Sequence, residues 1–200
     1  MNTSQLKFRQ KADAELVSAG AGDNDLKLKG RYIVEHWRGG KRINSYAFKN
    51  GITNEGKNSL LDVMFDGATQ ITTWWMGLID LVNYVTLADD DTYDDINQSG
   101  NQWDEFTDYT DSVNSDNAST RPVWDTDSAS AQAITNSVVA VYKMTAAGDV
   151  KGIFGVGGAP AAQTKGDHAP GPKLWATALF AADVPVVLND ELKVTYTVSA

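Results

Sequence analysis

The C-terminal residues show the simplest hydrophobic pattern in the chain. Apolar side chains at Val194, Tyr196 and Val198 alternate with small polar ones, a period of two that is typical of a strand with one buried face. A second segment, Ile71–Ile79, is apolar at nearly every position. This indicates a strand covered on both faces, and therefore a central place in a sheet.

A tight turn and a helix follow from the pattern of the first third. Strand-like runs over residues 31–37 and 41–48 flank Gly39-Gly40, and glycine adopts the positive φ that two-residue hairpin turns require. Residues 54–65 follow a helical period, and Thr53 precedes them as an N-cap. The apolar face of this helix consists of four side chains: Leu60, Leu61, Met64 and Phe65.

The rest of the chain predicts two further hairpins and two long loops. Strands are expected at 136–144, 150–156, 174–180 and 191–199. The Gly- and Pro-rich residues 157–173 are typical of an exposed loop. Residues 88–130, rich in Asp, Ser, Thr and Asn, are too long for a simple connection. We expect four aromatic side chains to hold them over the core: Trp103, Phe106, Tyr109 and Trp124.

Together these patterns predict a mainly β fold, an antiparallel β-sandwich or jelly-roll-like body over residues 31–200 with one short α-helix. Residues 1–30 are polar and lack a sustained apolar period, and residues 19–23, AGAGD, are typical of a flexible joint. We interpret residues 1–30 as an extended N-terminal arm that becomes ordered on a partner. The alternative interpretation is a disordered tail without a role.

Composition narrows the range of functions. The chain has no cysteine, which removes disulfides and thiol chemistry. Its apolar runs are too short to span a bilayer and its first residues do not form a secretory signal, so we expect no membrane association. The net charge of −9 argues against general nucleic-acid binding, because phosphates must be met by Lys or Arg.

The charge is unevenly distributed. Residues 1–49 hold ten Lys or Arg and five Asp or Glu, a net of +5, whereas residues 89–127 hold twelve Asp or Glu and one Arg, a net of −11. A basic N-terminal part and an acidic middle part indicate two surfaces with different neighbours.

Several motifs, taken in order, resemble a family of small virion proteins of tailed phages. The first two are NGITNEGKNSLLDVMF at residues 50–65 and TTWWMGLI at 72–79. Shorter ones follow: WDE at 103–105, Tyr109, RPVW at 121–124, ITN at 134–136, KGIF at 151–154, LWA at 174–176 and LKVTYTVSA at 192–200. The resemblance covers about residues 31–200. It is interrupted at 111–120, where extra Ser, Asn and Asp residues make the conformation of this loop an open question.

The resemblance implies a structural protein of a phage head or tail, and it favours a decoration (cement) protein on the outer surface of the capsid. Such a protein would be made in the cytoplasm of a bacterial host, would bind the major capsid protein, and would form a homo-oligomer, a dimer or trimer, without a cofactor or metal. Two alternatives stay open: a tail, adaptor or fibre-base component, and a virion-surface module that binds host glycans.

In this interpretation the N-terminal arm would lie across neighbouring capsid subunits. Ordering such an arm costs entropy, but it couples subunits through a wide surface. Five basic side chains are candidates for meeting acidic patches on the capsid: Lys7, Arg9, Lys11, Lys27 and Lys29.

The chain offers few candidates for catalysis. Glu105 and Arg121 lie among the aromatic residues that we expect to cover the core. A charge beneath aromatic side chains needs a partner, so we expect these two to form a buried or half-buried structural pair. A catalytic role is less favoured, because no second group of polar residues accompanies them. His36 and His168 lie far apart in the sequence without metal-binding spacing. Motifs of the GxSxG type are absent from the sequence. We therefore expect the protein not to be an enzyme.

Two further groups have alternative interpretations. Asp89–Asp91 and Asp94-Asp95 offer carboxylates for calcium, but their spacing does not fit an EF-hand loop, and a solvated acidic loop is favoured. Trp74 and Trp75 offer faces for sugar rings. Because adjacent strand residues point to opposite faces, we favour one tryptophan in the core and the other at a subunit contact.

Overall fold

The computed structural model describes residues 28–98, 102–113 and 117–200. Its longer elements are β1 (Lys29–Arg38), β2 (Lys41–Ile52), α2 (Asn54–Phe65), β3 (Trp74–Asp80), β7 (Ala140–Met144), β8 (Gly148–Gly157), β9 (Lys173–Val186) and β10 (Glu191–Ser199). Its short elements are β4 (Glu105–Phe106), β5 (Tyr109–Asp111), β6 (Ala133–Thr135) and two 3₁₀ turns, η1 (Tyr93–Asp95) and η2 (Pro160–Gln163).

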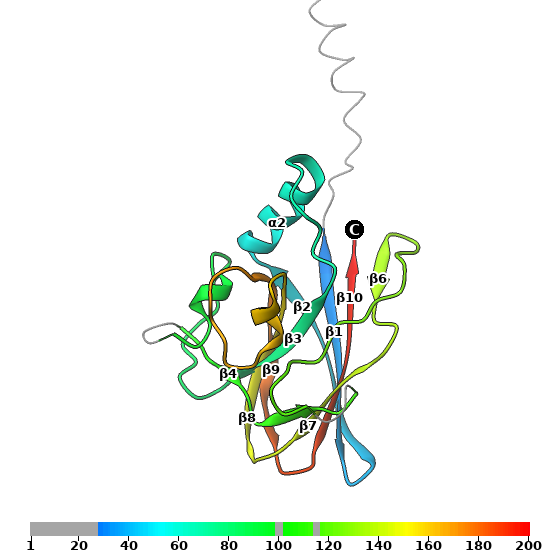
Figure 1. The fold of residues 1–200 in the computed structure, drawn as a ribbon. Coiled ribbons are helices and arrows are strands. Elements are labelled where there is room, and N and C mark those ends of the chain that lie inside the picture. The colour runs from blue at the N-terminus through cyan, green and yellow to red at the C-terminus, as the bar shows by residue number, and fades with distance from the viewer. Residues whose placement is uncertain (1–27, 99–101, 114–116) are drawn as a thin grey trace, which may run out of the picture.

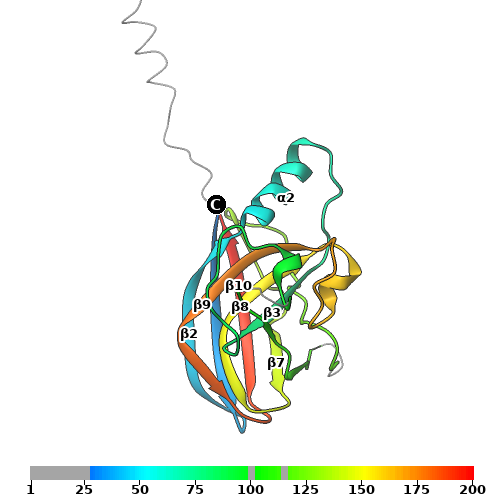
Figure 2. The ribbon, with the colours of Figure 1, turned by 90° about the vertical axis from the view of Figure 1, so that its left-hand side faces the viewer.

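The strands form one antiparallel sheet that curls into a nearly closed barrel (Figures 1 and 2). The strand order is β4-β3-β8-β9-β2-β1-β10-β7-β5, and β6 also pairs with β10. The predicted mainly β, antiparallel class with one helix is thus confirmed. The hairpin predicted around Gly39-Gly40 is present as β1 and β2, and both glycines have positive φ, 56° and 75°. The two hairpins predicted in the last third are wrong, because β7 does not pair with β8 and β9 does not pair with β10.

The segment that begins at Pro122 lies between the two edges of the sheet and closes the barrel there. The backbone N–H of Met76 on β3 donates to the Pro122 carbonyl (2.9 Å), and the N–H of Ser137 donates to the Asp125 carbonyl (2.8 Å). The Tyr142 hydroxyl on β7 reaches across and donates to the Met76 carbonyl (3.0 Å). Hydrogen bonds outside the regular strand pairing therefore join the β3 side of the sheet to its β7 side.

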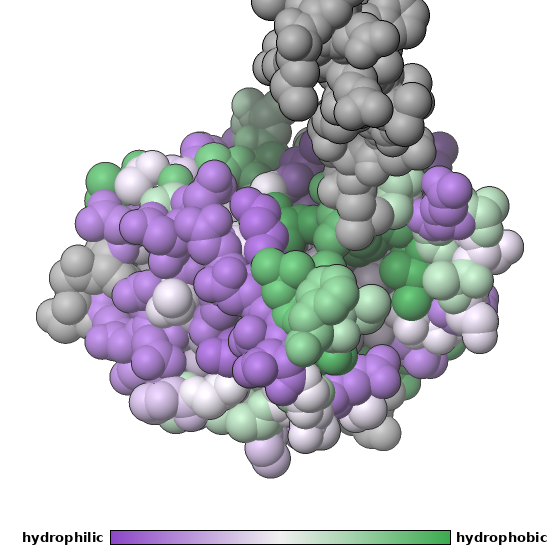
Figure 3. All heavy atoms as spheres, turned by 90° about the horizontal axis from the view of Figure 1, so that it is seen from above, coloured by the Kyte–Doolittle hydropathy of each residue, from purple (hydrophilic) through white to green (hydrophobic). Residues whose placement is uncertain are grey.

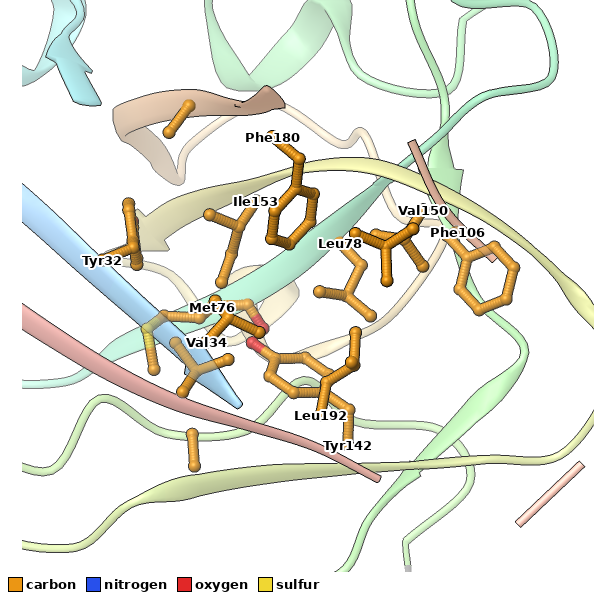
Figure 4. Close-up of a cluster of buried hydrophobic side chains, with 14 of the residues drawn as sticks. Tyr32, Val34, Met76, Leu78, Phe106, Tyr142, Val150, Ile153, Phe180 and Leu192 are labelled. Atoms are coloured by element: carbon orange, nitrogen blue, oxygen red, sulfur yellow. The ribbon is translucent and has the colours of Figure 1, made fainter. Parts of the chain in front are cut away.

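Alternating side chains fill the barrel interior. β10 buries every second residue, Leu192, Val194, Tyr196 and Val198, as its period predicts. Figure 4 shows how side chains from several strands meet in this interior cluster, among them Tyr32, Met76, Leu78, Ile153 and Phe180.

A second cluster lies on the outer face of β3 and β8, beneath the long acidic loop. Trp103, Tyr93 and Ile96 from that loop pack there with Phe154 of β8. The predicted role of Trp103 is thus confirmed. β3 is covered on both faces as expected. It is not central in the sheet, however, because only the short edge strand β4 lies beyond it. Its outer face is covered by a loop and not by another layer of strands.

The helix begins and ends where its sequence pattern predicts. The Thr53 hydroxyl accepts from the Gly56 N–H (3.0 Å) and donates to the Leu174 carbonyl (2.5 Å), so the N-cap also fixes the helix to β9. Gly56 allows this close approach: a Cβ at that position would lie 2.5 Å from the Trp175 carbonyl oxygen. From there α2 projects beyond the end of the barrel (Figure 1).

The predicted arm meets the barrel earlier than its expected boundary. Lys29 and Gly30 belong to β1 and pair with Ser199 and Val198 of β10, so these two residues are part of the sheet. The remaining arm candidates Lys7, Arg9, Lys11 and Lys27 lie outside the described residues. Within the described ranges, no helix is long and apolar enough to cross a membrane.

Candidate interaction surface

An apolar groove lies between α2 and the end of the barrel at which β1 begins and β10 ends. Its volume is about 530 Å³. Three α2 side chains and three tryptophans from the barrel supply much of its wall: Leu60, Val63, Met64, Trp74, Trp124 and Trp175. Leu28, the first residue that the structure describes, also lines it.

Hydrogen bonds and ring contacts fix the tryptophan wall. The Trp124 indole N–H donates to the Tyr196 carbonyl (3.1 Å), and the Trp175 indole N–H donates to the Tyr196 hydroxyl (3.0 Å). The ring of Trp74 lies 5.6 Å from that of Trp175, centroid to centroid. Trp75 is buried in the outer cluster. The prediction that Trp74 and Trp75 face opposite sides is confirmed.

The last turn of α2 presents its apolar side chains to solvent. Leu61, Met64 and Phe65 are 53%, 64% and 80% exposed. Figure 3, a view onto this end of the molecule, shows apolar side chains gathered beside a hydrophilic area. Since an exposed apolar patch next to a groove is typical of a binding surface, we take this end of the barrel as the candidate interaction surface.

Contacts at the opposite end of α2 account for how the helix is held. The Glu55 carboxylate accepts from the Leu174 N–H (2.7 Å) and the Tyr93 N–H (3.0 Å), and it forms an ion pair with the Lys173 ammonium (3.1 Å). These bonds and the Thr53 cap anchor the first turn. The exposed residues of the last turn are therefore not needed to fix the helix on the barrel.

A more polar pocket of about 490 Å³ adjoins the groove. The two share Ser59, Val63 and Ile71 in their walls. The polar pocket contains three carboxylates and one ammonium: Glu55, Asp62, Asp90 and Lys173. Because Lys173 pairs with Glu55, the remaining charge of this pocket is negative.

The structure brings Glu105 and Arg121 together as a bidentate ion pair. Arg121 Nε donates to Glu105 Oε1 (2.9 Å), Nη2 donates to Oε2 (2.7 Å), and both side chains are fully buried. Arg121 Nη1 donates to the Tyr93 hydroxyl (3.0 Å) and the Ala162 carbonyl (2.8 Å). Glu105 also accepts from the Gly166 N–H (2.7 Å).

This pair ties three segments of the outer layer together. Burial alone would lower the pKa of Arg121, but the adjacent Glu105 carboxylate raises that pKa above its ordinary value, so the guanidinium stays charged. The guanidinium also lies over the rings of Tyr93 (5.5 Å) and Phe154 (5.3 Å). The predicted pairing is present and its donors and acceptors are satisfied within the fold; that its role is structural stays a prediction.

A second ion cluster, centred on the buried Asp190, lies at the far end of the barrel, and the sequence patterns above did not lead us to predict it. Asp190 accepts from His36 Nε2 (2.7 Å) and from Arg38 Nε and Nη2 (2.8 and 2.7 Å). The Arg38 guanidinium, followed by His36, holds the pKa of Asp190 well below its usual range. His168, the other histidine, is exposed in the loop before β9.

The acidic loop uses some of its carboxylates to form turns. Asp91 accepts from the Trp103 indole N–H (2.9 Å) and from the Ala88 N–H (3.0 Å), and Asp95 accepts from the Thr92 N–H (2.8 Å). Among the residues that the structure describes, no group of three or more His, Asp or Glu side chains is placed to hold a metal ion. Asp91 and Asp95 therefore have roles within the loop itself.

Comparisons with known proteins find no match: no family model, no curated protein and no solved structure is similar to the chain. The function must therefore be argued from the chain itself.

Proposed function

We propose that this chain is a non-enzymatic structural protein of a tailed-phage particle that decorates the outer surface of the capsid. In this proposal it binds the major capsid protein through the candidate interaction surface and stabilises the head by many repeated contacts. The observation that carries the proposal is the apolar end of the barrel, with its groove and the exposed Leu61, Met64 and Phe65 beside the point at which β1 begins.

The physical case rests on how protein interfaces gain their energy. Aromatic and methionine side chains that enter pockets contribute most of the binding energy at typical interfaces. Burying one exposed Phe or Met side chain is worth ~1.5–3 kcal/mol. Met64 and Phe65 are both more than half exposed, so they have this energy to gain on a partner.

Charged groups elsewhere support an adhesive role over a catalytic one. Among the described residues, the buried carboxylates, the buried imidazole and the buried guanidinium each have hydrogen-bond partners within the fold: His36, Asp91, Glu105, Asp111, Arg121 and Asp190. A catalytic acid or base must be within reach of a substrate, and these groups are used to hold loops and strands. Lys29, an arm candidate, is exposed at the same end as the groove and extends the surface with a positive charge.

The groove itself bears on the glycan-binding alternative. Trp74, Trp124 and Trp175 would suit stacking against sugar rings, but aliphatic side chains such as Leu60, Val63 and Ile71 supply the rest of the apolar wall. Sugar hydroxyls need polar partners, whereas apolar side chains suit a protein partner. Ser59, Gln70, Thr72 and Thr126 also line the groove, but its apolar side chains outnumber them. We therefore favour a protein partner.

The test uses particles assembled with and without altered interaction surfaces. The full-length chain is expressed with the head genes of its own phage, and bound protein is quantified against the major capsid protein after the particles are purified. We expect the double variant Met64→Ser/Phe65→Ser to bind at least tenfold more weakly, because a tenfold loss corresponds to only ~1.4 kcal/mol. Its melting temperature should not change, because both side chains are more than half exposed.

The matched control is Val82→Ser/Val85→Ser, which alters two side chains of similar exposure, 65% and 68%, elsewhere on the surface. We expect this variant to bind like the unaltered protein. Equal binding by both variants would overturn the proposed surface. A copy number corresponding to a single small ring on the particle would favour the tail or adaptor alternative instead.

A further inference from the structure

We propose that residues 6–11 of this chain, LKFRQK, bind in the apolar groove of the same molecule. The inference concerns the isolated chain, and it holds or fails separately from the proposed role on the capsid. Three observations support it: where the N-terminal segment joins the barrel, the pattern of its apolar residues, and the charge beside the groove.

The N-terminal segment joins the barrel at the groove. Leu28 lines the groove and β1 starts at the next residue. Sixteen residues, 12–27, separate the proposed binding segment from Leu28. Sixteen residues span at most about 53–58 Å, which is enough for residues 6–11 to reach the groove, and linking two binding elements in one chain makes their association intramolecular. At ordinary protein concentrations a segment of the same chain is therefore favoured over one from a second copy.

The pattern of the segment suits one apolar wall. Leu6 and Phe8 alternate with Lys7, Arg9 and Lys11, so that in an extended conformation the two apolar side chains point to one side and the basic ones to the other. A groove of about 530 Å³ lies within the range of pockets that bind small ligands. Its wall of aliphatic side chains and tryptophans offers contacts to both Leu6 and Phe8.

Charge favours residues 6–11 over Leu16-Val17, the other pair of large apolar residues before Leu28. The adjoining polar pocket carries Asp62 and Asp90, and residues 6–11 contain three basic side chains and no acidic one. Leu16-Val17, in contrast, follows Asp13 and Glu15. Placing Leu16-Val17 in the groove would bring these carboxylates towards those of the pocket, and like charges repel. Residues 6–11 are thus the better match.

The test places a spin label on the N-terminal segment and observes the tryptophans. Since the chain has no cysteine, the full-length variant Gln10→Cys takes up a single nitroxide label. The readout is the set of indole N–H signals in ¹⁵N-labelled protein. We expect the label to cause loss of the groove signals of Trp74, Trp124 and Trp175. The signal of Trp37, which lies at the opposite end of β1, should persist.

Two variants and one mixing experiment make the test decisive. Adding Leu6→Ser/Phe8→Ser to the labelled chain should restore the groove signals, whereas Leu16→Ser/Val17→Ser should not. Spin-labelled ¹⁴N chains mixed with unlabelled ¹⁵N chains should leave the groove signals intact. Groove signals that persist in the original labelled chain would overturn the proposal. Groove signals lost in the mixture would also overturn it, because a second copy would then supply the segment.

Discussion

The buried Glu105–Arg121 pair gives the sharpest prediction about stability. Replacing Arg121 by methionine keeps a side chain of similar length but removes four hydrogen bonds of 2.7–3.0 Å, two of them to Glu105. The Glu105 carboxylate then stays buried with the Gly166 N–H and the Tyr109 hydroxyl as its remaining partners. A buried charge without its counter-ion is the main cost of this substitution.

The size of the effect follows from the burial of the pair. Both side chains are inaccessible to solvent, and removing one partner of such a pair costs ~3–5 kcal/mol. In a domain of this size 1 kcal/mol shifts the melting temperature by about 2–4 °C, so Arg121→Met should melt about 6–20 °C lower. Adding Glu105→Gln removes the unpaired charge but keeps an acceptor for Gly166, and should restore ~1–3 kcal/mol.

Thermal melts followed by circular dichroism, with urea titrations for the free energy of unfolding, measure these differences. The control is Arg42→Gln, which breaks the exposed ion pair with Glu35 (2.6 Å) and should cost less than about 1 kcal/mol. The reasoning is refuted if Arg121→Met melts within 2 °C of the control, or if the double variant is less stable than Arg121→Met alone.

Two further predictions concern a glycine in β8 and the aspartate that precedes β10. Gly152→Ala should destabilise by ~1–3 kcal/mol, because its Cβ would lie 2.2 Å from the Ala178 carbonyl oxygen. Gly155→Ala should cost less, because its Cβ would lie 3.6 Å from the nearest atom, on Trp175, which is an ordinary contact; equal melting temperatures would contradict this. Because Arg38 and His36 lower the pKa of Asp190, its stabilisation is present above the unfolded-state pKa of about 3.9 and is lost as pH falls towards the folded-state pKa. Asp190→Asn should therefore be less stable than the unaltered protein at pH 7, by a margin that shrinks below pH 4 in urea titrations; a constant margin would count against the assignment.

Local signals account for what the sequence predicted well. The cap at Thr53, the helical period after it and the strict alternation of β10 depend on neighbouring residues only, and each element begins or ends where its pattern indicates. The Glu105–Arg121 pair was also within reach, since both residues flank aromatic side chains that had to cover the core. β3 was harder to place, because an apolar strand covered by a loop has the same pattern as a central strand.

The groove was not predictable because its wall is assembled by topology. Leu60, Trp124 and Trp175 come from distant parts of the chain, and only the curling of the sheet beneath α2 brings them together. The His36–Asp190 contact spans 154 residues in sequence. One signal existed: His36 continues the buried face of Tyr32 and Val34, and a polar residue at an inward position requires a partner.

The antiparallel pairing of β1 with β10 has a practical consequence for engineering. Lys29 lies opposite Ser199, so a tag fused after Ala200 would stand close to the groove and crowd it. The Gly39-Gly40 turn lies at the other end of the barrel (Figure 1), and nothing lies within 4 Å of a Cβ built at either glycine. Because exposed loop tips tolerate insertions, a peptide inserted at this turn would be presented away from the groove and would not crowd it.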